Sequence, residues 1–335
     1  MIHFVFTLDY EIYGNGEGDL STLVLEPAER LAELFLRHGV RFVNFVEVAE
    51  FEKIESHGTD SAIAGVVGQI RRLHGQGFET ALHIHPQWYN ATREGGRWLL
   101  DYDEYNLCTL SRPRIAEIVD KAAGYLRYLV DDERYVPLSF RAGNWLFQPT
   151  QPAASVLAGF GVKVDSSVFK GGRQHAHGLD YRRAERNGYF WRFGEDVNVS
   201  DSSGAMMEVP IHTELVPAWK MATAKRMAFK GPGPMRGSVG RLNRLRDLAR
   251  LRYPLKLDFC RMTLEELTTT LGKVVLEDQR NPERLRPVVA IGHTKDLVDL
   301  DTVESFLHYL KTNNVQVSTF RDLAPSISAG ERPAE

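Results

Sequence analysis

The sequence has few cysteines, no long apolar run and no large excess of charge of one sign, and each absence narrows the possible classes of protein. Cys108 and Cys260 are the only cysteines in 335 residues, which argues against a disulfide framework and fits a reducing compartment. The sequence contains no stretch of about 18 apolar residues, which is the length that a transmembrane helix needs. The formal net charge of -3 gives no overall attraction to nucleic acid.

The amino terminus lacks the features of a secretory signal. The chain opens directly into the apolar run Ile2–Thr7, with no basic segment before it and no small-residue cleavage site after it. We therefore predict a cytoplasmic location. Gly14, Gly16 and Gly18 are followed by neither a lysine nor a helix pattern, so we interpret them as a flexible loop rather than a phosphate-binding loop.

Strand and helix patterns alternate along the chain. Apolar runs predict strands at 2–8, 40–46 and 78–85, and the intervening segments 27–37 and 60–76 carry apolar residues at helical spacing. This βαβαβ order implies parallel strands joined by right-handed crossovers. The pattern continues with expected strands at 136–140, 162–164, 206–211, 287–292 and 315–319, and expected helices at 111–130, 150–160, 263–276 and 300–311. With no clear linker, we predict a single domain over residues 1–325 and a polar tail at 326–335.

One segment differs in charge from the rest of the chain. Residues 220–256 contain eleven Lys and Arg and one acidic residue, Asp247, around a Gly-Pro-Gly-Pro break. We interpret residues 217–260 as a basic helical insertion that could contact an anionic partner. The alternative is a solvated basic face with no partner.

Two histidines and two carboxylates fall at the ends of predicted strands. His83 and His85 are two residues apart, so on a strand both imidazoles face the same side. Asp9 and Glu11 have the same spacing after the first strand. Two imidazoles and a carboxylate suit a borderline divalent ion, zinc above all. The alternatives are core histidines satisfied by their neighbours and a solvated strand end.

Other residues of catalytic type also follow predicted strands. Arg141, Asp165 and His293 each lie at the carboxyl end of a strand. Because α/β folds gather their active sites at that edge, we predict that these residues and the two pairs above form one site.

Five short motifs carry a resemblance to a known family. They are Thr-Leu-Asp-Tyr-Glu at 7–11, His-Ile-His-Pro at 83–86, Arg-Ala-Gly at 141–143, Asp-Ser-Ser at 165–167 and Gly-His-Thr at 292–294. In order and rough spacing, the set resembles the motifs of the polysaccharide deacetylase family, also called carbohydrate esterase family 4 or the NodB homology domain. The resemblance spans residues 2 to about 323. It implies a deformed (β/α)7-type barrel of parallel strands and metal-dependent removal of N-acyl groups from amino sugars.

The resemblance also implies roles for the metal-binding residues. Glu11, His83 and His85 would hold the divalent ion. The family's second motif usually places its histidines four residues apart, whereas in this chain they are two apart and Gln87 occupies the fourth position. Gln87 is therefore an alternative ligand.

The remaining roles concern proton transfer. Asp9 would be the general base, Arg141 would hold it ionised and oriented, and a protonated His293 would be the general acid. Asp165 would steady the arginine or the histidine. The first motif departs from the family's usual adjacent aspartates, and the third lacks its usual proline.

The sequence thus predicts a deacetylase or deformylase acting on an amino sugar, in the assembly of bacterial surface polysaccharide such as O-antigen. The sugar would be carried on a nucleotide or a lipid pyrophosphate, and the basic segment could also touch an anionic membrane surface. Alternatives from other classes are a metal-dependent hydrolase of another C–N bond, a glycoside hydrolase and an inactive carbohydrate-binding protein. Metal content and release of acylate distinguish them.

Overall fold

The fold is organised around β1 (Ile2–Tyr10), a strand whose side chains are nearly all buried. A computed structural model describes residues 1–185, 188–221, 223, 225 and 251–329. In it β1 pairs in parallel with β2 (Val43–Glu47) on one side and with β14 (Arg286–His293) on the other. A parallel strand buried on both faces is typically a continuous apolar run, as this one is.

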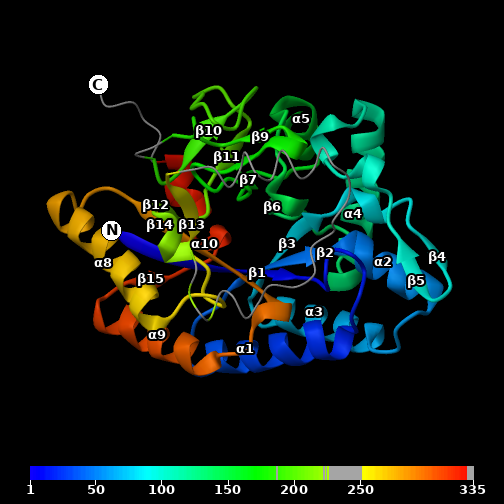
Figure 1. Cartoon of the computed structure of the whole chain (residues 1–335), viewed down its shortest axis with the longest axis horizontal. Helices are drawn as coiled ribbons and strands as arrows, with labels where there is room; N and C mark the ends of the chain where they lie inside the picture. Colours follow the sequence, from blue (N-terminus) through cyan, green and yellow to red (C-terminus); the bar gives the residue numbers. More distant parts are fainter. Residues whose placement is uncertain (186–187, 222, 224, 226–250, 330–335) are drawn as a thin grey trace.

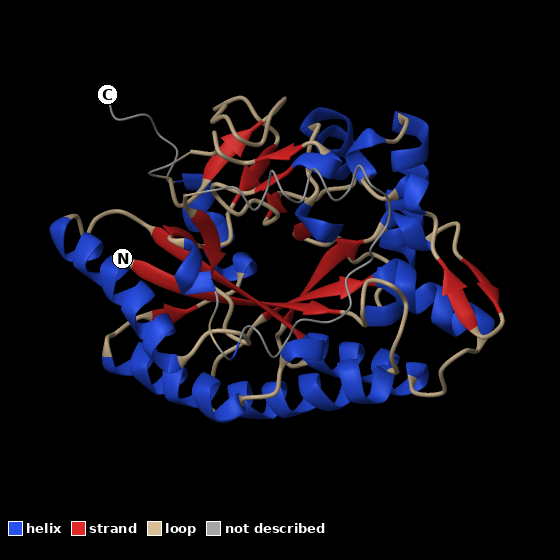
Figure 2. Ribbon diagram, in the orientation of Figure 1, coloured by secondary structure: helices blue, strands red, loops and turns tan. Residues whose placement is uncertain are grey.

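These strands belong to a nine-stranded sheet that is parallel throughout the described chain except at one edge. Its order is β10 (Trp191–Phe193), β11 (Met206–Glu208), β7 (Val164–Asp165), β6 (Ser139–Ala142), β3 (Glu79–Ile84), β2, β1 and β14, with β15 (Gln316–Val317) paired to β1. Only the pair β10–β11 is antiparallel. The sheet curls strongly, as Figure 2 shows, and a bridge between Ile211 and Val289 connects its two ends. The result is a deformed barrel.

Helices lie outside the curled sheet (Figure 1). They are α1 (Glu26–Arg37), α2 (Val48–His57), α3 (Ile63–Gly75), α4 (Arg112–Val130), α5 (Thr150–Gly159), α8 (Leu264–Arg280), α9 (Leu300–Thr312) and α10 (Phe320–Ala329). Each crossover helix buries an apolar stripe against the sheet. The predicted α/β barrel class is therefore confirmed. Within the described ranges, no helix is long and apolar enough to cross a membrane.

Three short strand pairs lie outside the main sheet in the described part of the chain. They are β4 (Thr92–Glu94) with β5 (Arg97–Leu99), β8 (Arg173–Gln174) with β9 (Leu179–Asp180), and β12 (Thr213–Val216) with β13 (Tyr253–Lys256). The β4–β5 hairpin lies in the aromatic segment after His85. Its Trp98 packs edge-on against Trp88, with ring centroids 5.3 Å apart.

Two helices differ from the sequence prediction. The first, α2, begins at a cap in which the Glu47 side chain accepts a hydrogen bond from Glu50 N, and it ends at Gly58 in the left-handed region. The second, α10, continues through Pro325 to Ala329, so the first residues of the segment predicted as a polar tail are helical. Burial of Ile327 anchors this last turn.

The predicted helical insertion at 217–260 is only partly visible. Residues 222, 224 and 226–250 lie outside the described residues. At the carboxyl end of the segment, residues 253–256 form strand β13 rather than a helix. The chain then runs beside β14, where Leu257 N donates to His212 O over 2.8 Å and Phe259 N donates to Ile291 O over 3.0 Å. This pairing brings the end of the insertion to the barrel wall.

Candidate active site

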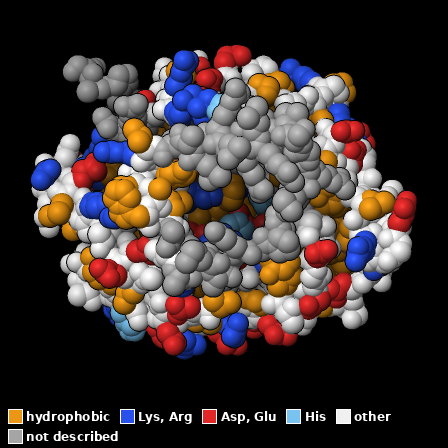
Figure 3. Space-filling view, in the orientation of Figure 1, with side chains coloured by type: hydrophobic (Ala, Val, Ile, Leu, Met, Phe, Trp, Pro, Cys, Tyr) orange, Lys and Arg blue, Asp and Glu red, His pale blue; other side chains and the backbone are white. Residues whose placement is uncertain are grey.

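The predicted site residues meet because neighbouring parallel strands end together. Asp9 of β1 is in register with His293 of β14, and His83 of β3 is in register with Arg141 of β6. Figure 3 shows that the molecule is hollowed above this region, with histidine and charged side chains visible inside the hollow. The strand ends thus supply the floor of a depression.

Glu11, His83 and His85 form a buried group whose ligand atoms lie within 4.8 Å of one another. Glu11 Oε2 lies 3.1 Å from His85 Nε2 and 3.4 Å from His83 Nε2. His83 Nδ1 lies 2.8 Å from the carbonyl oxygen of Arg141 and must donate a hydrogen there. Nε2 is therefore the nitrogen of His83 that faces Glu11, and it is the one that would bind a metal with the ring neutral. Burial acts to lower the pKa of the imidazole, but Glu11 leads a larger opposing effect that raises the pKa.

His85 has an equivalent partner in Gln87. Gln87 Nε2 lies 3.1 Å from His85 Nδ1, while Gln87 Oε1 is buried and has no hydrogen-bond partner among the described residues. Asn144 Nδ2 lies 3.3 Å from the same nitrogen of His85. Turning both amides by 180° lets His85 Nδ1 donate to Gln87 Oε1 and leaves His85 Nε2 free to bind a metal. Gln87 therefore orients His85 from the side of the ring away from Glu11 and is not placed as a ligand.

Gly143 gives the His85 ring the space it needs. A Cβ atom at this position would lie 2.6 Å from Ile84 O and 2.8 Å from His85 Cγ. Both distances are shorter than normal van der Waals contact. The glycine of the Arg-Ala-Gly motif therefore leaves room for the His85 ring in its present position.

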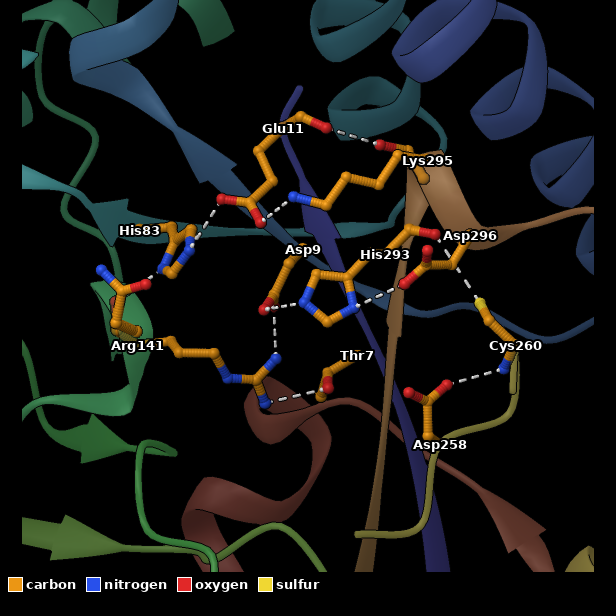
Figure 4. A network of polar contacts seen from close by, with 12 residues as sticks. Thr7, Asp9, Glu11, His83, Arg141, Asp258, Cys260, His293, Lys295 and Asp296 are labelled. Atoms are coloured by element: carbon orange, nitrogen blue, oxygen red, sulfur yellow. Dashed lines mark hydrogen bonds and ion pairs between the residues drawn. The ribbon is translucent and has the colours of Figure 1, made fainter. Parts of the chain in front are cut away.

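Electrostatics also favour a carboxylate in this group. Lys295 Nζ lies 2.8 Å from Glu11 Oε1 and donates to Ile12 O over 2.8 Å (Figure 4). Burial raises the pKa of Glu11, but Lys295 and His85 outweigh that effect and hold the pKa well below its usual range. Two imidazole nitrogens and one ionised carboxylate, with coordination positions left for water, match a catalytic zinc site. The residues present thus fit a divalent metal.

Asp9 lies beside this group and is fixed by Arg141. Arg141 Nη1 lies 2.5 Å from Asp9 Oδ1, Nη2 donates to Thr7 Oγ1 over 2.9 Å, and Nε donates to Ser166 O over 2.9 Å. The guanidinium carbon also lies 4.2 Å from the Phe45 ring centroid. Burial raises the pKa of Asp9, but the Arg141 charge leads a larger opposing effect, so the pKa is lowered and Asp9 stays ionised.

His293 lies beside Asp9 Oδ2, the oxygen that Arg141 Nη1 does not contact. Its Nε2 is 3.5 Å from Asp9 Oδ2, and its Nδ1 is 3.6 Å from Asp296 Oδ2, which also receives Arg261 Nη2 at 2.6 Å. Figure 4 shows the ring between the two carboxylates. Burial lowers the pKa of His293 to about 4, so the ring is neutral near pH 7. The sequence interpretation gave this histidine the role of a general acid that starts protonated, and that role stays a prediction.

Asp165 lies near the site but contacts neither Arg141 nor His293 in the described structure. Its Oδ1 accepts a hydrogen bond of 2.6 Å from Ser167 Oγ, which in turn accepts one of 2.8 Å from Ala142 N. Asp165 is also in register with Glu208 on the next strand. Burial raises the pKa of both carboxyl groups. Asp165 thus supports the backbone of β6 through Ser167.

Sequence reasoning missed two buried glutamates below the metal group. Glu47 Oε1 accepts a hydrogen bond of 3.0 Å from His85 N, and Glu50 Oε1 accepts one of 2.8 Å from Ile12 N. Burial raises the pKa of both well above the usual range. Glu47 is the last residue of β2, so the expectation that site residues lie at the carboxyl ends of strands could have identified it. Glu50 belongs to the unpredicted helix α2 and gave no such signal.

A second group of metal-binding residue types lies on the surface. It consists of His38, Glu304 and His308, with His38 Nε2 3.3 Å from Glu304 Oε1 and the two imidazole centroids 4.9 Å apart. We call it the surface group. It joins the end of α1 to α9, and none of its members is fully buried.

No family model matches the sequence, and neither does any curated protein. Similar solved structures do exist. A protein from Mycobacterium smegmatis described as a polysaccharide deacetylase is 15% identical, with a TM-score of 0.53 over 98% of this chain and 91% of that one. One from Pseudomonas aeruginosa PAO1 with the same description is 14% identical, with a TM-score of 0.52 over 100% and 93%. This chain has the polysaccharide deacetylase fold.

The same fold includes proteins with other names. The structure of PuuE allantoinase is 13% identical, with a TM-score of 0.51 over 98% of this chain and 91% of that one. At such low identities the similarity concerns the fold. These comparisons therefore support the predicted barrel architecture, and the function has to be argued from the site.

Proposed function

We propose that this protein is a metal-dependent hydrolase that removes an N-acyl group, acetyl or formyl, from an amino sugar. One observation carries the proposal. The potential metal ligands Glu11, His83 and His85 lie beside a second carboxylate, Asp9, which is held ionised by Arg141 and is not needed as a ligand. A metal-binding group with a separate base is the arrangement that metal-dependent amide hydrolysis uses.

Glu11, His83 and His85 would hold the ion, with zinc as the first choice. When bound, a zinc ion lowers the pKa of its water and polarises a carbonyl oxygen. Lys295, bonded to the other oxygen of Glu11, orients this carboxylate. The contacts of His83 with Arg141 O and of His85 with Gln87 fix the two rings before any ion arrives.

Asp9 would act as the general base. Arg141 occupies its Oδ1, which leaves Oδ2 to accept a proton from the attacking water. His293 Nε2 lies 3.5 Å from that same oxygen. Because His293 is neutral near pH 7, it would first receive the proton from Asp9 and then deliver it to the departing amine. This order makes His293 the proton donor without requiring it to be charged at the start.

The charge state of the two carboxylates at the end of β1 argues against a glycoside hydrolase that uses this pair. That reaction needs one carboxyl group that is protonated at working pH and one that is ionised. The pKa values of Asp9 and Glu11 are both lowered, so neither is suited to the acid role. A different C–N bond stays as a second candidate, because the structure named allantoinase shares this fold.

The cellular setting is part of the proposal. A cytoplasmic deacetylase would meet its sugar on a nucleotide or a lipid pyrophosphate during surface-polysaccharide assembly. The composition of residues 220–256 supports an anionic carrier or an anionic membrane surface. Most of that segment lies outside the described residues, so the support is compositional.

Two measurements on the purified protein test the proposed function. Metal analysis should find zinc, and a screen of N-acetyl and N-formyl amino sugars, free and nucleotide-linked, should release acetate or formate. Allantoin and nitrophenyl glycosides serve as probes for the alternatives. Release of nitrophenol without any acylate, or turnover of allantoin alone, would contradict the amino-sugar assignment.

A further inference from the structure

Lys256 places an ammonium group in the wall of the proposed active site. It is the last residue of β13, immediately before the segment that pairs with β14, and its side chain is partly buried. Lys256 Nζ lies 3.0 Å from the ring centroid of Trp145 and 4.9 Å from that of Phe169. Two aromatic faces therefore hold the cation.

This ammonium group has no hydrogen-bond acceptor and no ion pair among the described residues. The nearby acid Asp258 is engaged elsewhere. Its Oδ1 accepts hydrogen bonds of 3.0 Å from Cys260 N and from Arg261 N, and its Oδ2 lies 3.8 Å from Arg261 Nε. The other acid whose charge acts on Lys256 is Asp9, which is paired with Arg141. Three N–H donors are thus left for a ligand.

Trp145 connects Lys256 to the reacting groups. Its ring lies edge-on to His293, with centroids 6.3 Å apart, and its indole nitrogen is buried without a partner in the described structure. Trp145 and the preceding Asn144 both have positive φ, 59° and 55°. A bulky residue in that region is strained, and such strain is typical of functional sites. Asn144 Nδ2 also lies 3.3 Å from His85 Nδ1, so this turn contacts the metal group as well.

Lys256 changes what Trp145 can bind. Exposed tryptophan faces often stack on the apolar face of a neutral sugar ring, but in this site an ammonium group covers one face of the indole. A partly buried cation with free donors instead favours negatively charged oxygen, since charge-assisted hydrogen bonds are the stronger kind.

We propose that Lys256 is a specificity-determining residue that binds an anionic group, a carboxylate or a phosphate, on the sugar that carries the scissile amide. This inference rests on the proposed function for the identity of the bond cleaved. It goes beyond that function in placing a negative charge on the substrate beside Trp145, near His293, rather than on a distant carrier.

The charge state of Lys256 supports this assignment. Burial lowers its pKa to about 7, with further lowering by Arg261 and Arg141 that Asp258 and Asp9 oppose. An anion bound to the ammonium would raise the pKa again and take up a proton. Affinity for the anion should therefore fall as pH rises through about 7, because the free protein then loses the charge that binds it.

Calorimetric titration of the zinc-loaded protein tests the inference without relying on turnover. The probes are N-acetylglucosamine 1-phosphate, N-acetylglucosaminuronic acid and neutral N-acetylglucosamine. The wild type should bind one of the anionic probes more tightly than the neutral one, and Lys256→Met should weaken that probe by about 10- to 100-fold with little change for the neutral sugar. Preference for the phosphate or for the uronate identifies the anion.

Lys256→Arg and Lys311→Met are the matched variants. Arginine keeps the charge and should restore most of the anion preference, whereas a residue acting as a proton donor would not be rescued, because arginine does not lose its proton. Lys311 is exposed at the end of α9, and its replacement should change nothing. Equal affinity of the wild type for all three probes, or equal weakening of all three in Lys256→Met, would overturn the inference. The proposed function fails separately, if no acylate is released.

Discussion

The part of the chain that the structure describes contains two groups of the same composition, one glutamate and two histidines, in contrasting surroundings. Glu11, His83 and His85 are buried at strand ends, whereas the surface group lies at the end of α1 and on α9. In both, a glutamate oxygen lies just over 3 Å from a histidine Nε2, at 3.1 Å in the buried group and 3.3 Å on the surface. Ligand type and spacing alone therefore do not distinguish them.

The difference lies in what surrounds each group. In the buried group, His83 bonds to Arg141 O, His85 contacts Gln87, and Lys295 occupies the second oxygen of Glu11. In the surface group, Glu304 Oε1 is shared between His38 and Arg37, with Arg37 Nη2 at 3.7 Å. Orienting partners raise metal affinity, and burial strengthens electrostatic interactions. We therefore expect the buried group to hold its ion tightly and the surface group to hold one weakly.

Removing a ligand from the buried group should have the largest effect. His83→Ala or His85→Ala should lose bound zinc and acylate release together, because only two protein ligands would remain. Metal analysis after dialysis and an assay of acylate release measure both losses. Full zinc occupancy in either variant would refute the ligand set.

Asp9→Asn should have the next largest effect and should separate binding from chemistry. The amide keeps the shape but cannot take a proton from water, so turnover should fall by about 100- to 10,000-fold. Zinc content should stay at the wild-type level, because Asp9 is not a proposed ligand. Near wild-type turnover in this variant would remove the general-base assignment.

Much of the site was predictable because site residues of α/β folds gather at the carboxyl ends of the strands. Asp9, His83, Arg141 and His293 were placed from residue type and strand order alone, because parallel strands end at one edge whatever their exact length. Their mutual contacts follow from register, which the sequence does not specify. Asp165 shows that a strand-end position does not predict contacts, because it contacts neither Arg141 nor His293 in the described structure.

Other features depended on tertiary structure. Gln87 was a candidate ligand because it lies four residues after His83. The turn after β3 instead places its amide beside Nδ1 of the His85 ring, away from Glu11. Lys256 belonged to a segment interpreted as helical. The pairing of β13 with β12, and of the residues after it with β14, brings it to Trp145. The pKa of His293 depends on burial by elements far apart in the sequence, so its neutral state was not predictable from its position in a motif.

Gln87→Leu should have a smaller effect than loss of a ligand or of the base. Leucine is similar in size but cannot accept the His85 Nδ1 hydrogen, so the ring loses its orienting partner. Zinc affinity should fall by about 10- to 100-fold, as is typical when an orienting partner is removed. Competition with a chelator of known affinity measures the change. Gln87→Glu, which retains an acceptor, is the matched control, and equal weakening in both variants would point to a packing defect instead.

The double variant His38→Ala/His308→Ala should have the smallest effect and completes the comparison. The surface group is at least partly exposed and lies away from the strand ends, so water competes with any ion it binds and none of the proposed catalytic residues depends on it. Turnover and the zinc retained after dialysis should equal those of the wild type. Titration with excess zinc should show a weak additional site in the wild type that the double variant lacks. If the double variant instead lost tightly bound zinc, the surface group would be the stronger site, and burial and orienting partners would not be what sets metal affinity in this protein.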